Sequence, residues 1–258
     1  MHKTFKRIIK NLLNSLGYEV WHKSIRRPTT GSLERVLQEL RRRGLSCSSV
    51  LDVGANRGSW SRTAKQIFPE AKFYLIEPQV EMEPYLEAFC KEYPDSQYFL
   101  VGAGSRCGEF PLTVWPTKPK EGSTFRIPES SDLIFHGKDW QAEQRRVSVV
   151  TIDSLVEQNK ILLPQLVKLD IEGFELEVLK GASKLLGCTE IFILEVILFP
   201  LEIKLPQFAE VISFMNQRGY VVYDFAGFGH RPFDEALMIV DVVFTKKDSF
   251  LRSYPYLN

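Results

Sequence analysis

The sequence predicts an α/β fold, a mostly parallel sheet with helices on both faces, and three observations support this. From Ser49 onward, short apolar runs typical of strands alternate with segments of helical periodicity, as in parallel strands joined by crossover helices. Residues 50–58 read V-L-D-V-G-A-N-R-G, a strand that ends on an acid and turns through two glycines into a helix. The chain length of 258 residues suits one such domain with an N-terminal helical extension.

Composition and charge indicate an ordinary globular protein and disfavour several other classes. With 44% apolar and 25% charged residues the chain has an ordinary globular composition, and its net charge of +1 gives no general case for nucleic-acid binding. Residues 1–43 contain 11 Lys and Arg and 3 Asp and Glu, a net charge of +8. Since the whole chain has a net charge of +1, the remaining residues carry −7. The four cysteines form no C-x-x-C pair, so we expect reduced thiols and a cytoplasmic protein, without disulfides or a zinc site.

The extension, residues 1–45, precedes the α/β domain that we expect over residues 46–258. Within 3–16, apolar residues recur at helical spacing with Lys and Arg on the opposite side. Such a basic amphipathic helix can contact an anionic membrane surface, but the commoner arrangement, which we favour, is docking on its own domain or on a second subunit of a homo-oligomer. A second helix should follow Ser32 as N-cap and end near Gly44.

The remaining elements follow from periodicity and turn residues. We expect helices at 59–68, 80–92, 175–186 and 206–218, and a short one from Asp153. We expect strands at 72–76, 98–101, 109–114, 146–152, 166–169, 191–194, 220–223 and 238–244, with a turn at 102–104. Residues 117–140 are rich in Pro, Ser, Gly and Lys, which indicates an irregular insertion or lid.

Acidic residues gather at one edge of the predicted sheet. Asp52, Glu77, Asp170 and Glu195 each end a strand, and Gly102 and a loop at 224–236 fall at the same edge, where open α/β sheets bind ligands. Glu77 lies about 20 residues after the glycine turn, a spacing that suits hydrogen bonds to ribose hydroxyls. Asp52 would repel a pyrophosphate but would attract a cation. S-adenosylmethionine (SAM), with its sulfonium, ammonium and adenosine, fits both acids.

The glycine pattern agrees with this choice of cofactor. A dinucleotide site has G-x-G-x-x-G, whereas here Asn56 takes the second glycine position and the turn reads G-x-x-x-G. The competing interpretation is a turn whose glycines only permit tight packing. In the later segment V-K-L-D-I-E-G-F-E, Asp170 and Glu172 share one side of a strand end. Glu172 and Glu175 could simply favour a helix N-terminus, whereas we place Asp170 near the transferred methyl group.

Four motifs together, D-V-G-A-N-R-G, I-E-P, V-T-I-D-S-L and K-L-D-I-E-G-F-E, resemble the FkbM-type family of class I SAM-dependent methyltransferases. The resemblance covers about residues 50–244. It implies a seven-stranded Rossmann-like sheet with an inserted antiparallel strand at 238–244, SAM as cofactor, and O-methylation of a hydroxyl on a sugar, glycolipid or secondary metabolite. On this basis we expect a cofactor site formed by Asp52, Gly54, Ala55, Asn56, Gly58, Glu77, Pro78, Gly102, Ala103 and Asp170.

One position departs from the family pattern. Arg106 stands about where the family has an acid after the third strand. We therefore expect backbone groups of Gly102 and Ala103 to make the contact with the edge of the adenine ring.

Methyl transfer to a hydroxyl requires a group that takes the proton. Our candidates are Asp170 first, then Glu172, Glu195 and His230. His136, in the insertion, is a weaker candidate. The three carboxylates could instead hold a divalent metal, but they provide too few oxygen ligands, and we expect no metal. Lys168, two residues before Asp170, could tune that carboxylate by its charge.

Two other functions fit a sheet of this kind. An NAD(P)-dependent oxidoreductase is disfavoured by Asn56 and Asp52, and a non-catalytic adenosine-binding module would bind SAM without transferring methyl. We expect the acceptor to be a small molecule, a sugar or a lipid-linked glycan, held by residues 117–140 and 224–236, and we expect no nucleic-acid partner.

Overall fold

The computed structural model describes residues 31–114, 123–125, 143–198, 205–231 and 234–253. The predicted helix at 3–16, His136 and most of the predicted insertion lie outside these residues. Residues 31–258 form one compact unit. No helix among the described residues is long and apolar enough to cross a membrane.

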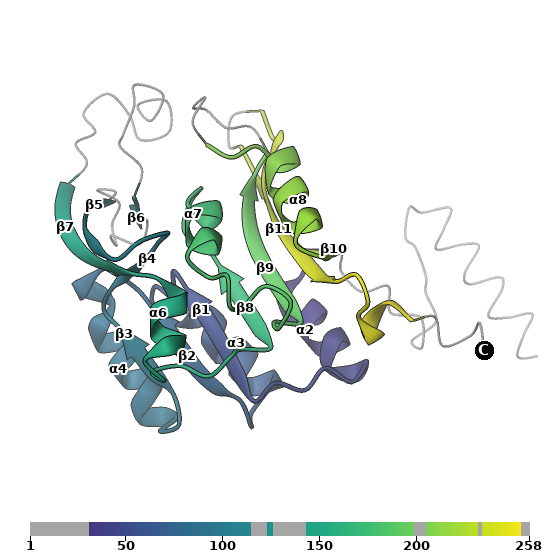
Figure 1. The fold of residues 1–258 in the computed structure, drawn as a ribbon, viewed down its shortest axis with the longest axis horizontal. Helices are drawn as coiled ribbons and strands as arrows, with labels where there is room; N and C mark the ends of the chain where they lie inside the picture. The colour runs from purple at the N-terminus through teal and green to yellow at the C-terminus, as the bar shows by residue number, and fades with distance from the viewer. Residues whose placement is uncertain (1–30, 115–122, 126–142, 199–204, 232–233, 254–258) are drawn as a thin grey trace, which may run out of the picture. The chain divides into compact units, whose positions relative to one another are not determined.

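The predicted seven-stranded, mostly parallel sheet is confirmed (Figure 1). Its spatial order is β10-β11-β9-β8-β1-β2-β3. Strands β9, β8, β1, β2 and β3 run parallel, and β11 lies antiparallel between β9 and β10, as the family resemblance implied. The strands span Ser49–Val53 (β1), Lys72–Ile76 (β2), Gln97–Phe99 (β3), Leu166–Leu169 (β8), Ile191–Ile197 (β9), Tyr220–His230 (β10) and Leu237–Lys246 (β11).

A second sheet of four strands stands beside the carboxyl ends of the first. It has the order β4-β7-β5-β6, with bounds Gly102–Ala103 (β4), Glu143–Val150 (β7), Gly108–Val114 (β5) and Ser123–Thr124 (β6). The predicted turn at 102–104 is therefore wrong. Gly102 and Ala103 pair in parallel with Val149 and Val150. This pairing gives their backbone N–H and C=O groups hydrogen-bond partners in a strand far along the chain, whereas a turn would use nearby residues.

Helices cover both faces of the main sheet. They span Leu33–Arg42 (α2), Ser59–Ile67 (α3), Glu83–Glu92 (α4), Ile152–Glu157 (α6), Glu175–Lys180 (α7) and Phe208–Gln217 (α8), with short 3-10 turns at Val80–Met82 (η1) and Phe250–Arg252 (η2). Apolar residues of α2, α3 and α4 share one buried cluster, and those of α6, α7 and α8 share the other. The sheet is thus the middle of three layers, and its central strands are buried on both sides.

Helix α2 belongs to this core. The Ser32 hydroxyl accepts the predicted N-cap hydrogen bond from the Arg35 N–H, and Val36, Leu37 and Leu40 of the helix are buried. Because these side chains join the buried cluster that α3 and α4 also share, α2 packs as part of the α/β core.

Three predicted boundaries shift. Helix α7 ends at Lys180 instead of residue 186, because a Cβ on the next residue, Gly181, would lie 2.1 Å from the Gly104 carbonyl oxygen and the backbones meet there. Strand β9 continues two residues past Glu195. The predicted loop from Asp224 is wrong up to His230, because β10 continues against β11 through register shifts that accommodate extra residues.

Candidate functional site

The turn after β1 brings the carboxyl ends of three strands together. The N–H groups of Gly54 and Ala55 donate to the Ile76 carbonyl at 2.9 and 3.1 Å, and the Asp170 N–H donates to the Val53 carbonyl at 3.0 Å. Gly54 has φ +80°, and a Cβ there would lie 1.9 Å from the Asp170 carbonyl oxygen. Only glycine permits this close approach, so the backbone itself forms the floor of a site.

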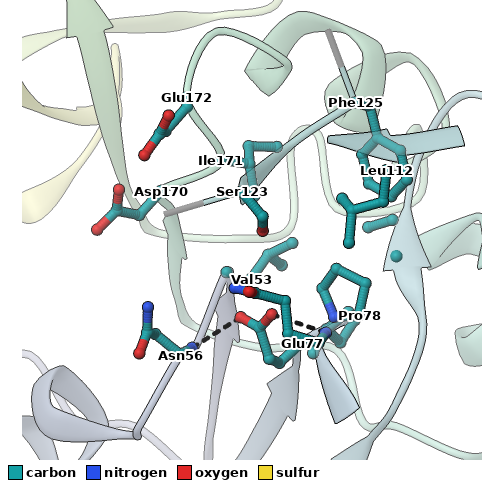
Figure 2. A pocket seen from close by; sticks show the side chains of 15 residues that line it. Val53, Asn56, Glu77, Pro78, Leu112, Ser123, Phe125, Asp170, Ile171 and Glu172 are labelled. Carbon is teal, nitrogen blue, oxygen red and sulfur yellow. Dashed lines mark hydrogen bonds between the residues drawn. The ribbon is translucent and has the colours of Figure 1, made fainter. Parts of the chain in front are cut away.

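A cavity opens above this turn, between the two sheets (Figure 2). Including its open mouth it holds about 620 Å³. Figure 2 shows Pro78, Leu112 and Phe125 gathered on one side and Asp170 and Glu172 on the other. The lining consists of Val53, Gly54, Asn56, Ile76, Glu77, Pro78, Gln79, Gly102, Ala103, Leu112, Ser123, Phe125, Asp170, Ile171 and Glu172.

Glu77 is fixed at the base of the cavity. Its Oε2 accepts the Asn56 N–H at 2.9 Å and its Oε1 accepts the Gln79 N–H at 3.0 Å. The side chain is 3% exposed, and burial raises its pKa to about 7 although the hydrogen bonds oppose the shift. Each carboxylate oxygen keeps a second lone pair. Glu77 can therefore accept a pair of adjacent hydroxyls, as a ribose presents them.

Asp52 lies behind this lining, on the side of the sheet that faces α3. It is 1% exposed, and the Ser61 hydroxyl donates to its Oδ2 at 2.6 Å. Burial raises its pKa to about 6, a shift that the Lys168 ammonium opposes. Of the other expected cofactor residues, Ala55 is buried outside the lining and Gly58 caps α3 at φ +69°. The expected contact of Asp52 with a cationic cofactor therefore stays a prediction.

Asp170 and Asp52 lie beside one buried cation, Lys168. Lys168 forms an ion pair with the Asp170 Oδ2, and its side chain is 7% exposed against 38% for Asp170. Asp52 sits opposite Lys168 in the β1–β8 register. Burial, together with the charges of Asp170, Glu175 and Glu172, holds the pKa of Glu195 well above its usual value. The charges of these groups are therefore coupled, and of them Asp170 and Glu172 line the cavity.

Glu175 supports the loop between β8 and α7. Its Oε1 accepts the N–H groups of Ile171 and Gly173 at 3.3 and 3.2 Å. It is 3% exposed, and burial raises its pKa to about 7. Glu172 adopts φ +51° and Gly173 φ +93° in this tight turn. The turn delivers Asp170 and Glu172 to the cavity, so Glu175 has a structural role that exceeds favouring a helix N-terminus.

Three further residues singled out in the sequence do not line the cavity. Glu195 is half-buried in β9, outside the lining. His230 is exposed at the last position of β10, an edge strand, and does not line the cavity. Arg106 also lies outside the lining and stacks on Phe110, with 5.2 Å between the guanidinium carbon and the ring centroid. Within the described residues, no group of three or more His, Cys, Asp and Glu side chains is arranged to hold a metal ion.

Several residues of the lining could not be recognised from any pattern in the sequence. Gln79, Leu112, Ser123 and Phe125 lie on connecting segments or on the small second sheet. The ring of Phe125 packs against Gly102 so closely that a Cβ on this residue would lie 2.2 Å from it. A glycine within a strand can indicate such a close neighbour. The neighbour's identity depends on long-range pairing that no local pattern specifies.

Comparison with known proteins decides the family. The model of the methyltransferase FkbM domain matches residues 52–222. The chain belongs to the FkbM methyltransferase family. The methyltransferase sdnD of Sordaria araneosa is 28% identical over 159 residues, which cover 52% of this chain and 60% of that protein. The chain thus matches less than two thirds of this curated relative's length.

Solved structures of methyltransferases are also similar. The FkbM methyltransferase of Methylobacillus flagellatus matches with a TM-score of 0.46 and 16% identity, over 76% of this chain and 43% of that one. The 1,6-didemethyltoxoflavin-N1-methyltransferase of Burkholderia thailandensis, solved with S-adenosylhomocysteine, matches with a TM-score of 0.43 and 10% identity, over 95% and 90%.

The matched domain is the methyltransferase domain of a family that uses SAM, which argues against the oxidoreductase interpretation. The residues of the cavity fit the cofactor. The glycine floor at Gly54 admits close backbone contact, Glu77 can accept the ribose hydroxyls, and Pro78, Leu112 and Phe125 offer apolar surface for a flat base.

Proposed function

We propose that the protein methylates a hydroxyl oxygen of a sugar, glycolipid or secondary metabolite. The observation that carries this proposal is the pair of acidic side chains on one side of the cavity, where Asp170 and Glu172 line the wall. A neutral alcohol gives up its proton only as the new bond forms, and a carboxylate within reach can take it. A row of hydroxyls, as on a sugar, would also find several acceptors there.

Asp170 is our first candidate for the general base that takes the hydroxyl proton. Lys168 holds one of its oxygens, Oδ2, which leaves Oδ1 for the acceptor. SAM, when bound, supplies a methyl group on an already activated sulfonium. Glu77 and the Gly54 turn orient the cofactor, while Asp170 Oδ1 accepts the hydroxyl proton as the oxygen attacks.

The test uses SAM with a carbon-13 methyl group. Purified protein is incubated with cell extract, and labelled products are separated by mass spectrometry and assigned by NMR to oxygen, nitrogen or carbon attachment. We expect an O-methyl product. Asp170→Asn, which keeps the size of the side chain, should lower the turnover number by about 10²–10⁴-fold, the contribution of general base catalysis.

S-adenosylhomocysteine binding, measured by calorimetry, is the control, since Asp170→Asn should bind this product within a few-fold of the wild type. A labelled N-methyl or C-methyl product would refute O-methylation. Full turnover in Asp170→Asn would refute the role of Asp170 while leaving the methyltransferase assignment intact.

A further inference from the structure

An ion pair joins the second sheet to the main sheet beside the cofactor cavity. Arg145 of β7 donates two parallel hydrogen bonds to Glu81 of η1, from Nη1 to Oε2 and from Nη2 to Oε1, each of 2.7 Å. A second carboxylate follows, since the Arg145 Nε lies 3.0 Å from the Glu143 Oε1. Every nitrogen of the guanidinium thus faces a carboxylate, and the side chain is 22% exposed. Most surface ion pairs contribute little to stability, but a bidentate pair within a network is the exception.

Arg145 extends from the face of the second sheet that borders the cavity. It lies directly opposite Leu112 of β5, and residues directly opposite each other in antiparallel strands extend from the same face. Leu112 is 1% exposed and lines the cavity, on the same side as Pro78 (Figure 2). A displacement of Arg145 therefore moves the pair of strands that carries this part of the wall.

Glu81 is attached to the part of the wall that the main sheet provides. It comes two residues after Gln79, which lines the cavity. Hydrogen bonds make this segment rigid, because the Gln79 N–H donates to the Glu77 Oε1 and the Met82 N–H donates to the Gln79 carbonyl, both at 3.0 Å. The position of Glu81 is thus coupled to that of Glu77 at the base of the cavity.

We propose that Arg145 and Glu81 are positioning residues for the cofactor, which hold the second sheet against η1 at the separation that SAM requires. The inference rests on SAM as the ligand of this cavity. Near its start the second sheet is held by the chain itself, since β3 ends at Phe99 and β4 begins at Gly102. At Leu112, farther along that sheet, the ion pair supplies a connection to the main sheet. A ligand that contacts both sheets binds more tightly when they are already held in place.

A double-mutant cycle in cofactor binding tests the pair. Calorimetry with S-adenosylhomocysteine compares the wild type, Arg145→Met, Glu81→Gln and the double variant. Each single variant should bind about 3- to 10-fold more weakly, the effect of one well-aligned, partly exposed ion pair. The double variant should bind no more weakly than either single variant, because the first substitution has already broken the pair.

Salt separates the charge of the pair from its packing. In about 1 M KCl, where the Debye length falls to about 3 Å, the difference in affinity between the wild type and each single variant should shrink. Any effect of salt on the ligand itself is common to all variants and cancels in the comparison. A loss caused by packing alone would keep its size.

Arg62→Met is the matched control, because Arg62 forms an ion pair with Glu92 that joins α3 to α4 outside the lining. It should leave the affinity as in the wild type. Thermal melting without ligand checks folding, and Glu81→Gln, at an exposed position, keeps the test available if Arg145→Met does not fold. Wild-type affinity in the single variants, losses that multiply in the double variant, or a loss that salt does not reduce would overturn the inference. Failure of the wild type to bind S-adenosylhomocysteine at all would instead overturn the cofactor site together with it.

Discussion

The turn after β1 should depend on Gly54 for two separable reasons, backbone conformation and contact. Its φ of +80° is unfavourable for alanine, and the added methyl group would lie 1.9 Å from the Asp170 carbonyl oxygen and 2.9 Å from its carbonyl carbon. The left-handed conformation costs about 1–2 kcal/mol, and forcing a methyl group into occupied space costs about 1–3 kcal/mol. Gly54→Ala should therefore lower the free energy of unfolding by about 2–5 kcal/mol.

Gly219→Ala is the matched control for the conformational part. Gly219 has φ +85°, and nothing lies within 4 Å of the position of a Cβ. This variant should lose only the conformational cost of about 1–2 kcal/mol. Urea denaturation of both variants and of the wild type measures the difference. Gly54→Ala should also bind S-adenosylhomocysteine more weakly, because the backbone at Asp170 must move. Equal losses of stability in the two variants would refute the contact argument.

Three further predictions concern the buried charges. Glu77→Gln should weaken S-adenosylhomocysteine binding about 10- to 100-fold in calorimetry, because hydrogen bonds to a charged group contribute about 1.5–3 kcal/mol; an unaltered affinity would mean that the ribose binds elsewhere. Lys168→Met should destabilise the protein by about 2–4 kcal/mol in urea, because Asp170 and Asp52 lose their cation. Adding Asp170→Asn should restore part of that loss, and simple additivity would contradict the coupling. The pKa of Glu175 rises from 4.5 to about 7 on burial, so its contribution to stability is complete below pH 4.5 and is lost as the pH rises to 7. Between these pH values the wild type should lose about 3 kcal/mol more than Glu175→Gln, and parallel pH curves of stability would argue against burial of the charge.

Much of the main sheet could be predicted because its central strands are buried on both faces. Strands β1, β2 and β8 are short apolar runs between glycine, proline and acidic residues, and such runs stand out in a sequence. The rule that ligands meet the carboxyl ends of parallel strands then brought Glu77 and Asp170 to one cavity.

The same burial hides which way a strand side chain points. All five residues of β1 are buried, so no alternation of polar and apolar residues reveals that Asp52 faces α3 and Lys168 instead of the cavity. The second sheet was missed for another reason. Its strand β4 has two residues and pairs with β7, far along the chain, and a pairing of that kind leaves no local pattern. Gln79 and Phe125 reach the cavity through such connections.

Helix α2 and strand β10 link distant parts of the chain, with a consequence for the order of folding. Arg43, directly after α2, donates a hydrogen bond of 2.5 Å to the hydroxyl of Tyr223 in β10, a partner 180 residues away. A nascent chain that grows from its N-terminus has made α2 long before β10 leaves the ribosome, and until then the apolar side of the helix lacks part of its cover. Synthesis should therefore pass through a stage in which Leu37 and Leu40 are open to chaperones, and release from that stage awaits the last two strands.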